Sequence, residues 1–191
     1  NYALAFFSLA NIHSDLKEYN DAVSCYQKAI EINPNIVGAH NNLGLVFREL
    51  NDFKNAINCY QKAIKIQPDH AGSHHNLALT LKELGKFDEA VKSHLIAIKY
   101  EPENLAHYHF LSELKDEILD SHLRDKITKI IVNDKSTKSN NAYGNYLLAK
   151  YERKTKDYEK ELNYLIKGHQ NYFEHKVKKF RLLVKYCFND V

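Results

Sequence analysis

The chain has 191 residues, of which 44% are hydrophobic and 27% are charged, a composition typical of a folded, water-soluble protein. Its 27 basic residues stand against 24 acidic residues, and a net charge of +3 is too small to indicate a nucleic-acid or membrane partner by itself. No apolar run approaches the roughly 18 to 20 residues that a membrane-spanning helix requires, so we expect a soluble protein.

Three prolines mark an internal repeat. Pro34, Pro68 and Pro102 are evenly spaced, and the period between them is long enough for two helices and two turns. The first period predicts one helix over about residues 3–16 and an antiparallel partner over about 19–32. Because the residue before a proline is pushed out of helical geometry, each proline should end a helix pair. The repeats are therefore assigned to residues 3–36, 37–70 and 71–104.

Small residues recur at fixed places in each period. A leucine on the first helix is followed directly by a small residue, and alanines seven residues apart lie on one face of the second helix, where they let a neighbouring backbone approach closely. The pattern predicts tightly packed pairs. Its members are Leu9-Ala10, Leu43-Gly44 and Leu77-Ala78 on the first helices, and Ala22, Ala29, Ala56, Ala63, Ala90 and Ala97 on the second.

The ends of the helices also follow the repeat. Asn35, Asp69 and Asn104 follow the three prolines and are candidate N-caps for the next helix. Between the helices of a pair, Gly85 is a natural turn residue and Asn51 tolerates the left-handed conformation that ends a helix, whereas Lys17 does so less well.

This pattern of large and small residues resembles the tetratricopeptide repeat, a helix–turn–helix unit whose period matches the spacing of the prolines. The resemblance covers about half of the chain, and His40 and His74 depart from it where the family favours Trp or Tyr. It implies an all-α, right-handed superhelical solenoid in which the first helix of each pair lines a concave surface. Proteins of this family bind protein or peptide segments in that groove.

By the same resemblance, the fifth and sixth positions of each first helix face the groove: Phe7, Ser8, Asn41, Asn42, His75, Asn76, His109 and Phe110. Asn42 and Asn76 are one period apart and should stack as a ladder. An amide offers both a donor and an acceptor, which suits a grip on the backbone of an extended peptide. Arg48 and Lys82 could add a basic strip. The candidate peptide-binding residues are Asn11, Asn41, Asn42, Arg48, His75, Asn76 and Lys82; the alternative is that the asparagines are ordinary solvated helix residues.

Some tetratricopeptide domains clamp a C-terminal carboxylate with two asparagines and several cations. Asn11 and Asn42 match the two asparagine sites, but Phe7, Gly72 and Asn76 stand at the cationic sites. Because the carboxylate would lose most of its charge-assisted hydrogen bonds, we do not expect this mode of binding.

After Glu103 the consensus decays, but the helical period continues. Residues 105–172 predict two degenerate helical pairs, joined by a polar connector at 135–141. A last amphipathic helix over 173–191 is expected to cap the array. Its basic segment, 175–185, leaves contact with an anionic membrane or nucleic acid as the less favoured alternative.

The second half also resembles a more specific family. Residues 107–115 and 141–170 are similar to the segment that links repeats to the catalytic domain in bacterial tetratricopeptide-repeat sulfotransferases. That resemblance implies an N-terminal module that presents substrate or mediates dimerisation. A sulfotransferase cradles a phosphate in a glycine-rich strand–loop–helix, and this chain, with 6 glycines, has neither such a loop nor a predicted strand. The catalytic part would then lie beyond Val191.

Histidine and cysteine give no convincing reactive site. The best histidine groups, His74-His75 and His107/His109, do not point from one helix face, and neither group has the i, i+4 spacing that chelates a metal. Cys25 and Cys59 occupy the same slot in successive repeats, which argues against a disulfide and suggests a reducing, cytoplasmic compartment. We therefore expect no catalytic residues, no metal and no cofactor.

These expectations combine into one functional hypothesis. The protein is a non-catalytic scaffold whose partner is a protein or peptide in the concave groove, with no nucleic acid and no membrane. The alternative is the sulfotransferase module, with a homodimer as a possible assembly. The absence of any methionine, including at position 1, suggests a fragment or processed chain.

Overall fold

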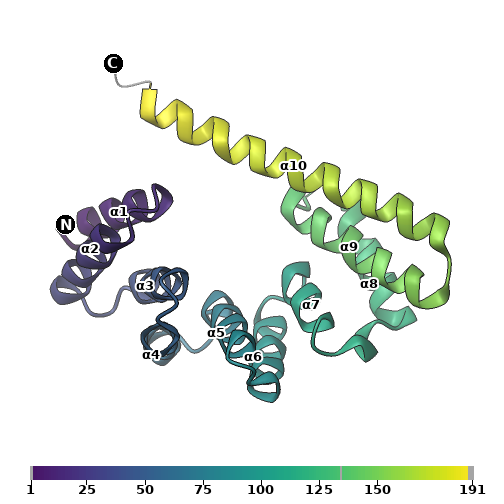
Figure 1. The fold of residues 1–191 in the computed structure, drawn as a ribbon, viewed down its shortest axis with the longest axis horizontal. Helices are drawn as coiled ribbons and strands as arrows, with labels where there is room; N and C mark the ends of the chain where they lie inside the picture. Colours follow the sequence, from purple (N-terminus) through teal and green to yellow (C-terminus); the bar gives the residue numbers. More distant parts are fainter. Residues whose placement is uncertain (1, 134, 189–191) are drawn as a thin grey trace. The chain divides into compact units, whose positions relative to one another are not determined.

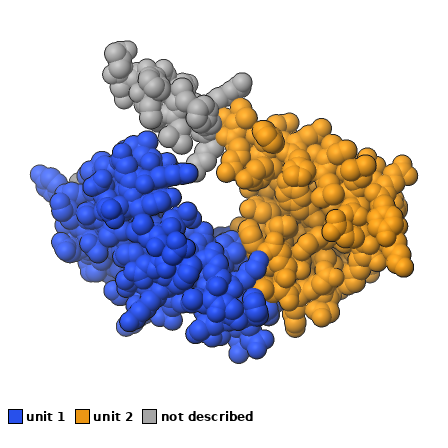
Figure 2. All heavy atoms as spheres, viewed as in Figure 1, with its two compact units in different colours: residues 1–101 blue, residues 102–191 orange. Residues whose placement is uncertain are grey.

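The computed structural model describes the backbone of residues 2–133 and 135–188, and the side chains of 2–133 and 135–177. These residues form ten α-helices and one short 3₁₀ helix, with no strand among them, which confirms the all-α prediction (Figure 1). The chain divides into two compact units, residues 1–101 and residues 102–191 (Figure 2).

Unit 1 consists of three antiparallel helix pairs. The second helix of each pair also packs against the first helix of the next, so that the core is a continuous stack. The predicted first pair, 3–16 and 19–32, agrees with the observed bounds to within one residue. The helices are α1 (Tyr2–Asp15), α2 (Tyr19–Ile32), α3 (Val37–Glu49), α4 (Phe53–Ile66), α5 (Ala71–Glu83) and α6 (Phe87–Tyr100).

The small residues of the repeat make this stack possible. The alanines of the second helices, from Ala22 to Ala97, are all fully buried. Gly44 on α3 lies so close to α4 that a Cβ atom there would be 2.6 Å from the ring of Tyr60. The predicted tight packing within pairs is therefore confirmed.

Two of the three predicted N-caps are wrong. Asn104 caps α7 by accepting a hydrogen bond from the backbone N–H of Ala106 at 3.2 Å. However, α3 and α5 begin one residue later than expected, after Ile36 and His70. The two residues that start at each proline are used in a turn, so the helix cannot begin directly after Asn35 or Asp69. His70 replaces Asp69 as the cap, since its Nδ1 accepts from the Ser73 N–H at 3.1 Å.

All three turn residues inside the pairs have left-handed backbone conformations. Lys17 has φ 62°, Asn51 φ 60° and Gly85 φ 74°. Lys17 thus occupies the same conformation as the glycine, although its side chain disfavours it.

His40 and His74 stand at positions where the repeat favours a large aromatic residue, and both rings make a hydrogen-bond contact that accounts for histidine there. The Nε2 of His40 lies 2.8 Å from the carbonyl oxygen of Pro34, and the Nε2 of His74 lies 2.9 Å from that of Pro68. In unit 2 the hydroxyl of Tyr108 donates to the Pro102 carbonyl at 3.1 Å. Each ring therefore ties the start of a helix to the proline turn before it.

Unit 2 contains α7 (Leu105–Ser112), a 3₁₀ turn (Asp116–Ile118), α8 (Ser121–Val132), α9 (Lys138–Thr155) and α10 (Tyr158–Phe188). We expected α7 to pair with the helix that follows it, but both α7 and α8 pack against α9. The connector predicted at 135–141 is shorter, because Thr137 caps α9 and residues 138–141 form its first turn.

The boundary predicted at residue 173 is not a helix boundary. α10 continues as one helix from Tyr158 to Phe188, since no proline interrupts this stretch. The predicted capping role of 173–191 depends mainly on side chains from 178 onward, which lie outside the described residues.

Two glutamates in unit 2 are buried beside arginines. Glu161 stands where alanine is usual in the repeat, and its Oε1 lies 2.6 Å from Arg153 Nη2. Glu152 lies 3.3 Å from Arg124 Nε. Such pairs offset the cost of burying a carboxylate. Within the described residues, no helix is long and apolar enough to cross a bilayer.

Candidate functional site

The first helices of unit 1 form the inner side of its stack. α3 contacts both α1 and α5 in addition to its neighbours among the second helices (Figure 1). Helices on the inner side of a curved stack approach one another most closely, so this surface is the one on which the predicted groove residues should meet.

An asparagine network runs across this surface and joins the three repeats. Asn42 Nδ2 donates to Asn11 Oδ1 at 2.9 Å, which links α3 to α1. Asn76 Nδ2 donates to Asn41 Oδ1 at 3.0 Å, which links α5 to α3. Asn41 Nδ2 in turn donates to Asn42 Oδ1 at 3.1 Å. The structure therefore brings together four of the seven candidate residues.

The expected ladder of Asn42 above Asn76 is replaced by a staggered arrangement. Both side chains bond to Asn41, so it is Asn41, 8% exposed, that connects them. The reason is that Asn42 lies opposite Asn11 on the preceding helix, whereas the equivalent position opposite Asn76 is Leu45, which offers no acceptor.

The network occupies particular hydrogen-bonding sites and leaves others for a ligand. Asn11 Oδ1 accepts from both Asn42 and the Tyr26 hydroxyl at 2.6 Å, and Asn41 Oδ1 accepts from both Asn76 and the Ser73 hydroxyl at 3.1 Å. Since a carbonyl oxygen has two lone pairs, these two oxygens are saturated. Each amide nitrogen, in contrast, donates at most one of its two hydrogens within the described residues. Within the described residues the surface consequently presents N–H donors together with the oxygens of Asn42 and Asn76, which accept at most one hydrogen bond each.

A pocket of about 370 Å³ opens beside the network. It is lined by Asn11, Ser14, Asp15, Tyr26, Asn42 and Leu45. Burial raises the pKa of Tyr26, and the nearby charge of Asp15 raises it further. The repeat pattern did not predict Tyr26, because it belongs to a second helix; Asp15, at the end of α1, lies one helical turn after Asn11.

The predicted basic strip is less accessible than expected. The side chain of Arg48 is 18% exposed, and its Nη2 lies 3.6 Å from the Glu49 carboxylate. Lys82 is half-buried on α5. His75 packs edge-on against the buried ring of His94, with centroids 5.3 Å apart. These three residues lie on the first helices but outside the amide network.

The site is poorly suited to a carboxylate. Phe7, at a position where a clamp needs a cation, packs its ring 6.1 Å from that of Tyr26. Asp15 adds a negative charge to the same pocket. The expectation against a C-terminal clamp is consistent with both features.

Other pockets lie away from the predicted residues. The furrow between α2 and α4, over α3, has a volume of about 780 Å³, and a similar furrow of about 300 Å³ lies one repeat later between α4 and α6. Most residues lining the second furrow lie one period after residues lining the first. Because they recur with the repeat, we attribute these furrows to the stacking of the second helices.

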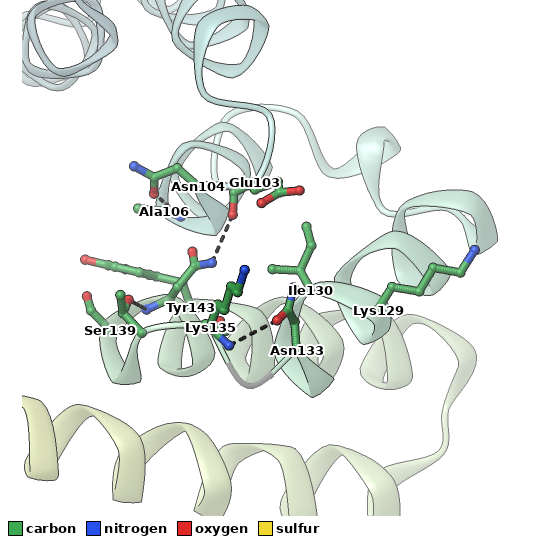
Figure 3. A pocket seen from close by; sticks show the side chains of 12 residues that line it. Glu103, Asn104, Ala106, Lys129, Ile130, Asn133, Lys135, Ser139 and Tyr143 are labelled. Atoms are coloured by element: carbon green, nitrogen blue, oxygen red, sulfur yellow. Dashed lines mark hydrogen bonds between the residues drawn. The ribbon is translucent and has the colours of Figure 1, made fainter.

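Unit 2 has a pocket of about 660 Å³ among the start of α7, the end of α8 and the start of α9 (Figure 3). Asn140 spans it, since its Nδ2 donates to the Glu103 carbonyl at 2.9 Å and its Oδ1 accepts from the Leu105 N–H at 2.7 Å. This side chain holds α7 against α9.

Three histidines that recur in the packing of the repeats, His40, His74 and His94, are buried. One group in the described part of the chain places three potential metal ligands together: His13, Glu18 and Asp21. His13 Nδ1 and Glu18 Oε2 are 2.6 Å apart, so this contact already accounts for their proximity by closing the turn between α1 and α2.

Comparison with known proteins supports the repeat assignment. Three models described as tetratricopeptide repeat match residues 3–36, 25–58 and 73–106, and one described as TPR repeat matches 44–85. No protein with a curated description matches the sequence significantly. None of the matches supports the sulfotransferase resemblance.

Solved structures are similar in fold. The first TPR of Spaghetti (RPAP3), bound to the HSP90 peptide SRMEEVD, matches with a TM-score of 0.59 and 19% identity, over 62% of this chain and 94% of that one. The Arabidopsis OM64 TPR domain matches with a TM-score of 0.59 and 22% identity, over 61% of this chain and 96% of that one.

Proposed function

Residues 3–106 belong to the tetratricopeptide-repeat family, and on that premise we propose that the protein is a non-catalytic scaffold that binds a protein or peptide segment on the inner surface formed by α1, α3 and α5. The observation that carries the proposal is the asparagine network. It is continuous across three repeats, and within the described residues it leaves amide N–H groups, together with the oxygens of Asn42 and Asn76, for a ligand.

The chemistry of the surface indicates how the ligand is held. Amide N–H groups donate to carbonyl oxygens, and an extended peptide presents such oxygens regularly along its backbone. A ligand held by its backbone needs no particular terminal group. We therefore propose that an internal segment binds here, rather than a free C-terminal carboxylate, which needs cations to hold it.

A paired substitution tests this site. A ligand is first selected from a displayed library of random peptides, and the synthetic peptide is then titrated against the Asn42→Ala/Asn76→Ala variant. Removing the two donors should weaken binding by more than about 1 kcal/mol, or about fivefold, given typical net hydrogen-bond energies. The matched control is Asn20→Ala/Asn58→Ala, which removes two exposed amides from the second helices α2 and α4.

Because the asparagines also join the repeats, stability must be separated from binding. Ser73→Ala removes a fully buried hydroxyl that donates to Asn41 Oδ1 but leaves every amide donor in place. It should lower the free energy of unfolding by about 1 kcal/mol while the peptide affinity stays within about twofold. If the double alanine variant folds and binds the peptide as tightly as the wild type, the site is not the asparagine network.

The alternative of a sulfotransferase module has no specific observation in its favour, since none of the matches supports it. A reducing, cytoplasmic location is part of the proposal. Cys25 and Cys59 are both free thiols, and differential alkylation of the protein as isolated from its cells should find both reduced.

A further inference from the structure

The pocket at the junction of α1, α2 and α3 is placed to receive one side chain of a bound peptide. Its volume of about 370 Å³ is near the lower end of the range for ligand pockets, which suits a single side chain. Asn42 lines the pocket and also belongs to the asparagine network. A peptide backbone held by Asn42 therefore runs past the mouth of the pocket. Since successive side chains of an extended peptide point to opposite sides, one of them can enter.

The lining of this pocket supplies acceptors and one negative charge. Asp15, exposed at the end of α1, contributes its carboxylate. Ser14 contributes a hydroxyl, and Asn42 Oδ1, which accepts one hydrogen bond from Asn41, keeps a second lone pair. Among the described residues, no cationic side chain lines the pocket. The lining thus suits a positively charged group that carries several N–H donors.

The second repeat shows which side chain fits such a place. Arg48 stands one period after Ser14, and Tyr60 stands one period after Tyr26. The Arg48 side chain is 18% exposed, and its Nη2 lies 3.6 Å from Glu49, the counterpart of the pocket's carboxylate. Burial raises the pKa of Tyr60, and the charge of Arg48 opposes that shift. A guanidinium therefore already lies near a tyrosine and a carboxylate in the second repeat, where the first repeat has only the small side chain of Ser14.

We propose that this pocket binds an arginine side chain of the peptide, with the Asp15 carboxylate as its counter-ion; this inference rests on the proposed binding of a peptide by the asparagine network. The Ser14 hydroxyl and Asn42 Oδ1 accept further hydrogen bonds from the guanidinium, whose planar array of N–H groups needs several acceptors. The ligand is then an internal segment with an arginine next to the carbonyl groups that the network holds. The charged pair supplies a selectivity that recognition of the backbone lacks.

The first test changes the charge of the peptide and not its shape. Peptides are selected on the wild-type protein from a displayed library of random sequences, and the best binder is synthesised with both ends blocked. A second form carries citrulline, the uncharged analogue of arginine. The selected sequences should share an arginine at one position. The citrulline form should bind the wild type at least about fivefold more weakly, because it loses a charge-assisted hydrogen bond.

The second test changes the pocket. Asp15→Asn removes the counter-ion, so this variant should bind the two peptide forms with affinities within about twofold of each other. Because a negative charge at a helix C-terminus is unfavourable, this substitution at the end of α1 should not impair folding. Ser14→Arg copies the residue of the second repeat into the pocket and should weaken binding of the arginine form more than about tenfold. The matched control, Asp88→Asn, removes an exposed carboxylate at the start of α6 and should change neither affinity.

The Asn42→Ala/Asn76→Ala variant separates failure of this inference from failure of the proposed function. If the peptide needs these two asparagines but lacks a shared arginine, or binds equally well in its citrulline form, the arginine site is wrong and the network remains the binding site. If Asp15→Asn discriminates between the two forms as the wild type does, the assignment to this pocket is wrong, whether or not Ser14→Arg folds. If no peptide is selected, or if the double alanine variant binds normally, the proposed function fails and the arginine site fails with it.

Discussion

Two glycines with the same steric surroundings allow a direct test of how tightly the helix pairs are packed. A Cβ atom at Gly44 would lie 2.6 Å from Tyr60 Cε1 and 2.8 Å from Cδ1; at Gly168 it would lie 2.6 Å from Tyr146 Cε1 and 2.8 Å from Cδ1. Real Cβ atoms essentially never come so close, so in each case the ring must move. The two rings differ in their freedom to do so.

Tyr60 is fully buried, whereas Tyr146 is half-exposed on α9. Overpacking a closed core costs about 1 to 3 kcal/mol, and replacing a helical glycine by alanine returns about 0.5 to 1 kcal/mol. Gly44→Ala should therefore lower the free energy of unfolding by about 1 to 2 kcal/mol. At Gly168 the ring of Tyr146 can turn toward solvent, which removes most of the steric cost, so Gly168→Ala should change stability by about 0.5 kcal/mol or less.

The measurement is urea denaturation followed by circular dichroism in the far ultraviolet, with the slope of the transition compared between variants. If the slope of the transition is the same for all variants, the difference in the free energy of unfolding does not come from a change in the compactness of the unfolded state. The reasoning is refuted if Gly44→Ala is as stable as the wild type, or if the two variants lose the same free energy. Equal losses would mean that exposure of the ring does not control the response.

Three further predictions concern the repeat itself. Lys17→Gly should raise the free energy of unfolding by about 0.5 to 1 kcal/mol in urea denaturation, because Lys17 is held at φ 62°, where a side chain is strained; a loss would contradict this. His40→Phe keeps the ring but removes the donor to the Pro34 carbonyl at 2.8 Å, so the midpoint should fall by an amount equivalent to about 1 kcal/mol, and no change would show that the bond is dispensable. Burial raises the pKa of the Cys59 thiol from 9.0 to about 11, so its contribution to stability is complete below pH 9 and is lost as the pH rises through 11. The wild type should thus lose more stability than Cys59→Ala between pH 9 and 11, and parallel curves would exclude this role.

Much of the fold followed from local spacing. The regular period and the small residues within it predict three helix pairs, and the observed bounds of the first pair agree with the prediction to within one residue. The N-caps were less predictable. Whether Asp69 or His70 caps α5 depends on the path of the turn after the proline, which residue type alone does not specify.

For the candidate site, sequence reasoning found the amides but not their connections. The period placed Asn42 and Asn76 on one surface, but it could not show that Asn41 links them, because that depends on which side chain of the neighbouring helix lies opposite each one. Tyr26 joined the site for the same reason, because it approaches from α2, whereas Asp15 lies one helical turn after Asn11 on α1.

The sequence by itself determined the repeated features of the fold: where the helices lie, how first and second helices alternate, and which helix faces are apolar. These features depend on residues a few positions apart. The tertiary structure alone decided which faces are covered. Leu9 and Leu43 are the same residue at the same place in the repeat, yet one is 42% exposed and the other 5%. Burial depends on the neighbour a helix receives, and a local pattern carries no information about that neighbour.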